Sequence, residues 1–365
     1  MIWIGALLLV GTMSWVLTGL LRRYALAKKI LDVPNERSSH LAPTPRGGGL
    51  AIVVSFLTSI LVLWWLGGGG ANLGKEVTSS FHGVVASSLS IGIDTPLLLA
   101  LLGAGGCVAL IGFLDDHRHI LTRWRLLVHF VSAGWVLIWL NGLPPLPVFG
   151  VTLELGWFGY ALATVYLVWL LNLYNFMDGI DGIAGVEAMT VCLGGSILYL
   201  LSPSVGSAVW MLPMLLFCSV VGFLIWNFPP AKIFMGDAGS GFLGLMLGSL
   251  QIQAAGANPD LFWAWLILLG MFVVDATVTL IRRIMRGEKF YKAHRSHAYQ
   301  YAARKFGSHK VVALAFGGIN ILFLMPIAVL VTLGKLEGVI GVFIVYTPLI
   351  LLALFFRAGT IEVKR

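Results

Sequence analysis

Long apolar runs separated by short polar segments make up most of the chain. A helix that crosses a bilayer needs about 20 mostly apolar residues, and such runs recur often enough to predict about 11 membrane-spanning helices. The expected spans are residues 2–21, 47–66, 97–114, 126–141, 157–173, 183–201, 208–227, 239–255, 261–281, 311–333 and 338–356. We therefore expect an all-α, polytopic integral membrane protein that forms one domain over residues 1–365.

The composition agrees with this pattern. Of the 365 residues, 58% are hydrophobic and 11% are charged, whereas a soluble domain has roughly 25% charged residues. The formal net charge is +8. The basic residues stand in short loops between apolar runs, so the expected partner is the lipid bilayer and not a nucleic acid. The three cysteines lie inside apolar runs without metal-site or disulfide spacing, which indicates packing residues.

Lysine and arginine are distributed unevenly between alternate loops. If the N-terminus is outside, the outside segments hold only Lys75 and Lys335 among the basic residues. Because basic residues collect in cytoplasmic loops, we expect the N-terminus outside and the loops that hold the other basic residues in the cytoplasm. The expected inside segments are residues 22–46, 115–125, 172–182, 228–238, 282–310 and the tail from residue 357.

The same orientation places five aspartates from three loops at the inner membrane surface. They are Asp115, Asp116, Asp178, Asp181 and Asp237. No acidic residue was used to assign the orientation. Convergence on one side is what an active site needs, although a solvated loop can also carry an aspartate by chance.

Asp115 and Asp116 end an apolar run, and adjacent carboxylates repel each other. A cation or a bound phosphate group relieves that repulsion. Arg118, Arg123 and Arg125 follow closely and favour an anion. The alternative is a charge pair at a helix end in water.

The second motif runs from Asn172 to Gly185. Asn172, Asn175 and Asp178 are three residues apart and can share one face of a helix. Their carboxylate and amide oxygens suit a hard divalent cation, and Mg²⁺ keeps one or two protein ligands while taking phosphate oxygens for others. A calcium loop is disfavoured because its oxygen spacing and distal glutamate are missing.

The third motif places Asp237 between a Pro229-Pro230 pair that ends a helix and small residues that begin another. Backbone N–H groups at such a helix start attract phosphate. The alternative is that the glycines only allow close helix packing, as at Gly244 and Gly248.

The longest inside loop contains His294, Arg295, Ser296 and His297. Two histidines and an arginine in four residues are typical of diphosphate ligands or of a zinc pair, but further zinc ligands are not nearby. Binding of anionic lipid headgroups is the alternative.

Two further residues have weaker signals. Arg46 belongs to a rigid, basic inside segment that either shapes an entry for a lipid phosphate or only forms a loop. Asp275 lies within an expected span, where an acid is costly and often functional. The alternative for Asp275 is pairing with a basic residue near the interface.

Four motifs, taken in order, carry a resemblance that covers nearly the whole chain. They are Leu31–Pro34 with Pro45–Gly48, Phe113–Asp116, Asn175–Gly182 and Phe234–Asp237. In sequence, order and expected sidedness they resemble the polyprenyl-phosphate N-acetylhexosamine-1-phosphate transferases. The resemblance implies a multi-pass enzyme of the bacterial inner membrane. It implies that undecaprenyl phosphate attacks the β-phosphate of a UDP-N-acetylhexosamine, which releases UMP.

The resemblance also implies roles for particular residues. Asn175 and Asp237 would hold Mg²⁺, with Mn²⁺ as an alternative. Asp115 and Asp116 would act at the acceptor phosphate, and Asp178 is the third candidate catalytic carboxylate. The candidate substrate-binding residues are Asp181 and Phe234 at the uracil, His294, Arg295 and His297 near the diphosphate and sugar, and Arg46.

One feature departs from the peptidoglycan branch of that family. That branch has a run of histidines in the last loop, whereas this chain has His294-Arg295-Ser296-His297. The difference favours the branch that initiates O-antigen or related surface polysaccharides. A transporter or flippase of lipid-linked sugars is the alternative function, but transporters place polar residues near the bilayer midplane. The oligomeric state is open, with a homodimer as one alternative.

Overall fold

The computed structural model describes residues 2–34, 42–67, 93–118, 120–202, 209–288 and 294–360. The helices are α1 (Ile2–Ala27), α2 (Leu50–Leu66), α4 (Thr95–His117), α5 (Thr122–Trp139), α6 (Gly156–Met177), α7 (Ile183–Leu201), α8 (Met211–Asn227), α9 (Asp237–Ala257), α10 (Asp260–Leu268), α11 (Gly270–Met285), α12 (Ala298–Phe306), α13 (His309–Ile319), a π-helical turn (Asn320–Leu324), α14 (Met325–Thr332) and α15 (Gly338–Phe355). Two short antiparallel pairs join β1 (Leu31–Asp32) to β2 (Thr44–Pro45) and β3 (Leu146–Val148) to β4 (Val151–Leu153).

The all-α, polytopic prediction is confirmed. Within the described ranges, six helical segments are long and apolar enough to cross a membrane. A seventh is the pair α10–α11, which is bent by 72°. The six are Trp3–Ala27, Thr95–His117, Gly156–Met177, Ile183–Leu201, His309–Thr332 and Gly338–Phe355. Helix length and composition thus support fewer spans than the eleven expected. Short helices such as α2 and α8 pack among longer ones and have the same apolar signature as a span.

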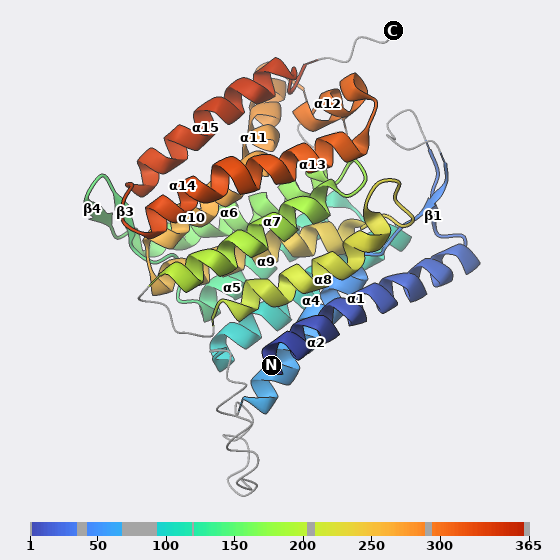
Figure 1. Ribbon diagram of the computed structural model, residues 1–365, viewed down its shortest axis with the longest axis horizontal. Helices are drawn as coiled ribbons and strands as arrows, with labels where there is room; N and C mark the ends of the chain where they lie inside the picture. The colour runs from blue at the N-terminus through green and yellow to red at the C-terminus, as the bar shows by residue number, and fades with distance from the viewer. Residues whose placement is uncertain are drawn as a thin grey trace, which may run out of the picture.

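The helices lie side by side, and their connections gather at two opposite ends of the bundle (Figure 1). One end holds the β1–β2 pair and α12, and we call it the β1 end. Its loops contact one another across long sequence separations: the Arg22 side chain donates to the Lys232 carbonyl at 3.3 Å. At the other end, the N–H of Phe149 after β3 donates to Glu337 before α15 at 3.0 Å. The loops that carry the candidate site residues belong to the β1 end.

α9 is the centre of the bundle and is buried along nearly its whole length. Small residues allow its neighbours to approach closely. A Cβ added to Gly112 of α4 would lie 2.6 Å from the Cα of Ala238. A Cβ added to Gly244 of α9 would lie 2.4 Å from the Leu170 carbonyl oxygen of α6. This close packing brings the ends of α4 and α6 against the first turn of α9, where the aspartates lie.

Candidate active site

The first component is the end of α4. Asp116 is only 5% exposed, and the N–H of Asp237 donates to its Oδ1 at 3.4 Å. Its other oxygen, Oδ2, is buried and has no hydrogen-bond partner among the described residues. Arg46 donates a hydrogen bond to the backbone carbonyl of Asp116. The structure therefore brings Arg46, Asp116 and Asp237 together at the end of α4.

Arg125 links the other carboxylates. Its Nη1 pairs with Oδ2 of Asp115 and lies 3.1 Å from Oδ2 of Asp237. Asp115 also accepts a hydrogen bond of 2.7 Å from the N–H of Ile120. Sequence reasoning noted Arg125 as part of a basic loop but did not select it as a site residue. The signal was present, because Arg125 lies one α-helical turn into α5, directly after the Asp115–Asp116 loop.

The loop between α6 and α7 supplies the next group. The Asn175 side chain hydrogen-bonds to the Asp237 side chain and donates to Oγ of Ser240 at 3.2 Å. The two residues predicted to hold a metal therefore lie in contact. Asp178 follows the last turn of α6. Burial raises its pKa well above the usual range, and the nearby Asp237, Asp181 and Asp116 carboxylates raise it further.

These residues form a carboxylate cluster, which we define as Asp115, Asp116, Asp178 and Asp237. Arg46 and Arg125 contribute two positive charges against as many as four negative ones. A divalent cation would offset the excess, and the donors present are the hard oxygens that Mg²⁺ prefers. The unpartnered Oδ2 of Asp116 fits such a site. No three His, Cys, Asp or Glu side chains in the described ranges are arranged as a ready metal site.

Asp181 and Phe234 lie beside this cluster. Asp181 Oδ2 accepts from the N–H of Ala231 at 3.0 Å, and its Oδ1 lies 3.3 Å from Nδ1 of His309. Phe234 is half-buried, and its N–H donates to the Pro45 carbonyl at 2.8 Å. These bonds tie the loop before α9 both to the α6–α7 loop and to the segment that carries Arg46. His309 begins α13 and was not anticipated from the sequence, which gives it no motif.

A cavity of about 230 Å³ lies next to Asp181's partner His309. Its lining includes Ile180, Arg295, Arg304 and His309. The cavity therefore has basic walls and borders the Asp178–Gly182 segment. An anionic group bound here would lie close to the carboxylate cluster.

Asp275 binds the backbone directly after the His294–His297 loop. The carboxylate of Asp275 accepts hydrogen bonds of 2.9 Å from the N–H groups of both Ala298 and Tyr299, at the start of α12. Nδ1 of His297 lies 3.5 Å from its Oδ1. Asp275 therefore lies beside a basic side chain, His297, as the alternative suggested, and it also binds the backbone N–H groups at the start of α12. A carboxylate at a helix N-terminus is stabilised by the free N–H groups there.

The two histidines of this loop have different surroundings. His297 is 3% exposed and stacks between His294 and Tyr299, with ring centroids at 4.8 and 5.6 Å. His294 is half-buried, and its Nδ1 lies 2.9 Å from Oγ of Ser296. Burial lowers the pKa of His294 to about 3, helped by the neighbouring His297 and Arg283. His294 is therefore neutral at physiological pH.

The His294–His297 loop is joined to the rest of the site by Tyr299. Its hydroxyl donates to the Phe176 carbonyl at 3.1 Å, within the Asn175–Asp178 segment. A Cβ added to Gly179 would lie 2.1 Å from that hydroxyl, so a side chain there would displace Tyr299. Neither Tyr299 nor Asp275 was predicted as a site residue. For Asp275 the sequence did contain a signal, because an acid within an apolar run is often functional.

The known proteins that this chain resembles are transferases of one family. Residues 98–255 match the model of glycosyl transferase family 4. A probable undecaprenyl-phosphate N-acetylglucosaminyl 1-phosphate transferase of Bacillus subtilis is 29% identical over 86% of this chain and 81% of its own length. A decaprenyl-phosphate N-acetylglucosaminephosphotransferase of Mycobacterium leprae is 30% identical over 86% and 82%. A phospho-N-acetylmuramoyl-pentapeptide-transferase of Streptococcus thermophilus is 27% identical, over 82% of each chain.

Proposed function

Since the chain belongs to glycosyl transferase family 4, and within it to the polyprenyl-phosphate N-acetylhexosamine-1-phosphate transferases, we propose that it transfers N-acetylhexosamine 1-phosphate from a UDP-sugar to undecaprenyl phosphate. One observation carries the proposal. The ends of α4 and α6 and the first turn of α9, far apart in the sequence, bring Asp115, Asp116, Asn175 and Asp237 together at one end of the bundle, with Arg125 paired to Asp115 and Asp237. A membrane lipid and a water-soluble nucleotide can both reach a site at such an end.

In the proposed reaction, an oxygen of the lipid phosphate forms a bond to the β-phosphorus of the UDP-sugar. The bond between that phosphorus and the bridging oxygen breaks, and UMP leaves. Two anions must approach each other, so neutralising their charge supplies most of the catalysis. Arg125 and Arg46 are the basic side chains placed for this role. Mg²⁺ or Mn²⁺ held by Asn175 and Asp237 would neutralise the diphosphate.

The remaining carboxylates have separate proposed roles. Asp115 and Asp116 orient the acceptor phosphate, and one of them accepts its last proton. The second pKa of a phosphate group is about 6, so this proton transfer contributes modestly. The raised pKa of Asp178 keeps it protonated more readily than an ordinary aspartate, so it can donate a hydrogen bond to a phosphate oxygen. Asp181 and Phe234 bind the uracil, and His294, Arg295 and His297 bind the diphosphate and sugar.

We further propose an orientation and a location. The β1 end faces the cytoplasm and the N-terminus lies outside, in a bacterial inner membrane that the chain crosses eleven times. The shorter helices α2 and α8 also run between the two ends of the bundle, which supports the higher number (Figure 1). Membrane-impermeant thiol reagents should label a cysteine placed at Lys335 from outside and spare one placed at Ser308. The reverse pattern would refute the orientation.

The proposed product initiates O-antigen or a related surface polysaccharide, and the donor is an N-acetylhexosamine, in the narrowest form a 6-deoxy sugar such as N-acetylfucosamine. The motive is the His294-Arg295-Ser296-His297 loop, which lacks the run of histidines of the peptidoglycan branch. The test of the function is UMP release by the purified protein from UDP-sugars in the presence of undecaprenyl phosphate. An absence of UMP release with every UDP-N-acetylhexosamine would refute it.

A further inference from the structure

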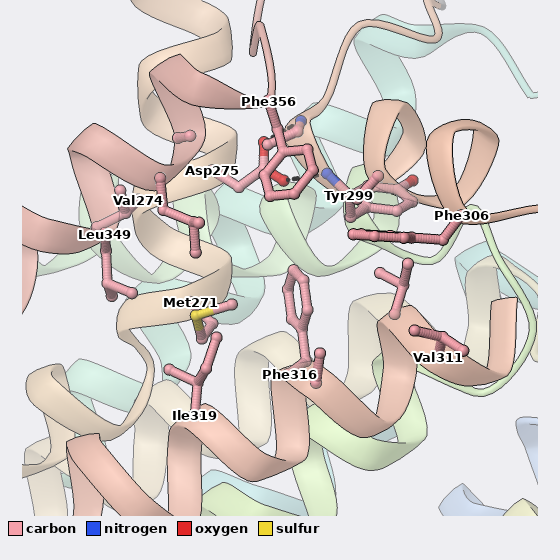
Figure 2. Close-up of a pocket in the computed structure, with 16 residues that line it drawn as sticks. Met271, Val274, Asp275, Tyr299, Phe306, Val311, Phe316, Ile319, Leu349 and Phe356 are labelled. Atoms are coloured by element: carbon pink, nitrogen blue, oxygen red, sulfur yellow. Dashed lines mark hydrogen bonds between the residues drawn. The ribbon is translucent and has the colours of Figure 1, made fainter. Parts of the chain in front are cut away.

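A second cavity, of about 240 Å³, lies outside the carboxylate cluster. It lies between α11, α12, α13 and α15, four helices from the last third of the chain (Figure 2). Its walls include Met271, Val274, Phe316, Ile319, Leu349 and Phe356. It is larger than the apolar cavity of about 150 Å³ that remains dry and binds benzene in an engineered lysozyme. The space is therefore sufficient for part of a hydrocarbon chain.

The cavity offers a ligand almost no hydrogen-bonding group. Asp275 is the one residue of its lining with a carboxyl group. Both Asp275 oxygens already accept from the α12 N–H groups, and Thr279 donates to one of them at 3.2 Å. Tyr299 also lines the cavity, and its hydroxyl donates to the Phe176 carbonyl. Only an apolar group gains free energy by entering such a space.

Apolar side chains at and beside the cavity are exposed on the protein surface. Phe306 and Val311 line it and are 54% and 49% exposed. The neighbouring Leu314 and Phe355 are also exposed, at 52% and 67%. These exposed apolar side chains offer an acyl chain an apolar path to the cavity.

Basic side chains lie beside the part of the cavity wall that Phe356 forms. Lys305 Nζ lies 4.8 Å from the ring centroid of Phe355 and 5.6 Å from that of Phe356, a residue of the cavity wall. Arg357 is exposed directly after Phe356. Arg282 donates to the Ala358 carbonyl at 2.7 Å. An apolar cavity with a cationic rim matches an amphiphile that has a hydrocarbon chain and an anionic head.

We propose that this cavity binds one acyl chain of an anionic phospholipid, whose phosphate lies against Lys305 and Arg357. The acceptor polyprenyl phosphate is a poorer fit. It must present its phosphate to the carboxylate cluster, and no member of that cluster lines the cavity. The bound chain packs on Tyr299 and Asp275, the residues that hold the His294–His297 loop and α12. Lipid bound here therefore stabilises that loop.

The proposal can be tested on the full chain in nanodiscs of phosphatidylcholine. The probe is phosphatidylglycerol with a photoreactive diazirine near the end of one acyl chain. Crosslinks should map to peptides that contain Phe316, Ile319 or Leu349. Ala353→Phe fills the cavity from α15 and Ala302→Leu fills it from α12, and each should reduce this crosslinking severalfold. Both alanines are buried and line the cavity.

One control distinguishes filling of the cavity from the mere addition of a large side chain. A second pair of variants tests the role of the basic charge. Ala161→Phe adds the same ring on the exposed face of α6 and should leave the cavity crosslinks unchanged. Lys305→Gln should weaken phosphatidylglycerol binding about fivefold, the effect of one basic residue at an anionic lipid surface. Lys335→Gln, at the opposite end, should not. Lys305 is exposed, so this variant tests the proposal even if a cavity-filling variant fails to fold.

Three outcomes would overturn the proposal. One is equal crosslinking by phosphatidylcholine and phosphatidylglycerol probes, which would remove the role of charge. Another is crosslinks spread over exposed apolar helices such as α1, with no response to Ala302→Leu. The third is displacement of the probe by undecaprenyl phosphate at lower concentration than by phosphatidylglycerol, which would assign the cavity to the acceptor. Crosslinking is measured without turnover, so its failure is distinguishable from failure of the proposed reaction.

Discussion

Tyr299 of α12 donates a hydrogen bond to the carbonyl of Phe176 at 3.1 Å, across 123 residues of sequence. This bond joins the loop of His294–His297 to the segment that carries Asn175 and Asp178. The second anchor is Asp275, which accepts the N–H of Tyr299. The relative position of the two loops therefore depends on Tyr299, which is not itself a member of the carboxylate cluster.

Replacing Tyr299 with Phe should reduce turnover more than it reduces stability. The ring remains buried, but the Phe176 carbonyl loses its donor. We expect a destabilisation of about 1 kcal/mol. Because a small displacement of a positioning loop is costly in catalysis, kcat should fall about tenfold or more. Steady-state kinetics and thermal unfolding in detergent measure the two effects.

Tyr301→Phe is the control for that variant, since Tyr301 lies in the same helix and its hydroxyl bonds the Thr360 carbonyl at 3.1 Å. Its kcat should stay near the wild-type value. Equal kinetic losses in both variants would show that α12 acts only through stability.

Removing the guanidinium of Arg125 should nearly abolish activity. Arg125 pairs with Asp115 and lies 3.1 Å from Asp237, so Arg125→Met leaves these carboxylates without their shared cation. A loss of about 10²-fold or more in kcat/KM is expected for a group that stabilises charge in the transition state. Arg123→Met, an exposed neighbour that contacts the Trp124 ring, is the matched control. Normal turnover of Arg125→Met would remove Arg125 from the site.

Activity should require Mg²⁺ or Mn²⁺, and EDTA should abolish it. Asp237→Asn should raise the metal concentration needed for half-maximal activity and lower the maximal rate, since a charged ligand is lost. Direct binding of Mn²⁺, followed by its paramagnetic resonance spectrum, gives a readout independent of turnover. Asp260→Asn, at the first residue of α10, is the control. Full activity in EDTA would rule out the metal site.

His294 should make stability depend on pH below neutrality. Its pKa is lowered from 6.5 to about 3 in the folded chain, chiefly by burial. The unfolded chain therefore binds a proton that the folded chain does not, between pH 6.5 and 3. Stability should fall as the pH falls through this window. In His294→Asn, which cannot take up that proton, the thermal midpoint should fall less between pH 7 and pH 5 than in the wild type. Identical slopes for the two proteins would contradict the prediction.

The 2-acetamido group should be the strictest requirement of the sugar site. A pocket that does not bond a hydroxyl rejects it only about a hundredfold, whereas a site built to bond a polar group rejects its absence far more strongly. UDP-glucose should therefore be used much less well than UDP-N-acetylglucosamine or UDP-N-acetylfucosamine. UMP release with each donor measures this order. Preferred use of UDP-glucose would refute the acetamido requirement, and preference for N-acetylglucosamine would refute only the 6-deoxy donor.

The class of fold and the chemistry of the loops could be predicted from local patterns of residues. Apolar runs predicted helices, because a chain in lipid must satisfy its backbone hydrogen bonds internally. Helical residues occupy each predicted span, although the span 261–281 is divided into α10 and α11. The motifs around Asp115, Asn175 and Asp237 were readable because each is a local pattern of oxygen donors and small residues. Their gathering at one end of the bundle followed from the alternation of loops between two sides.

Which side chains meet could not be predicted in this way, because it depends on how the helices pack. Arg125 lies between Asp115 and Asp237, residues on different helices, and Asp275 binds the start of α12, 23 residues further along the chain. The 72° bend between α10 and α11 is also invisible in the apolar pattern, which runs through it without a break. Such contacts depend on how closely helices pack, as where Gly112 meets Ala238. The distance between two packed helices depends on how the side chains of both fit together. Because those side chains are far apart in the sequence, a local pattern of residues does not predict it.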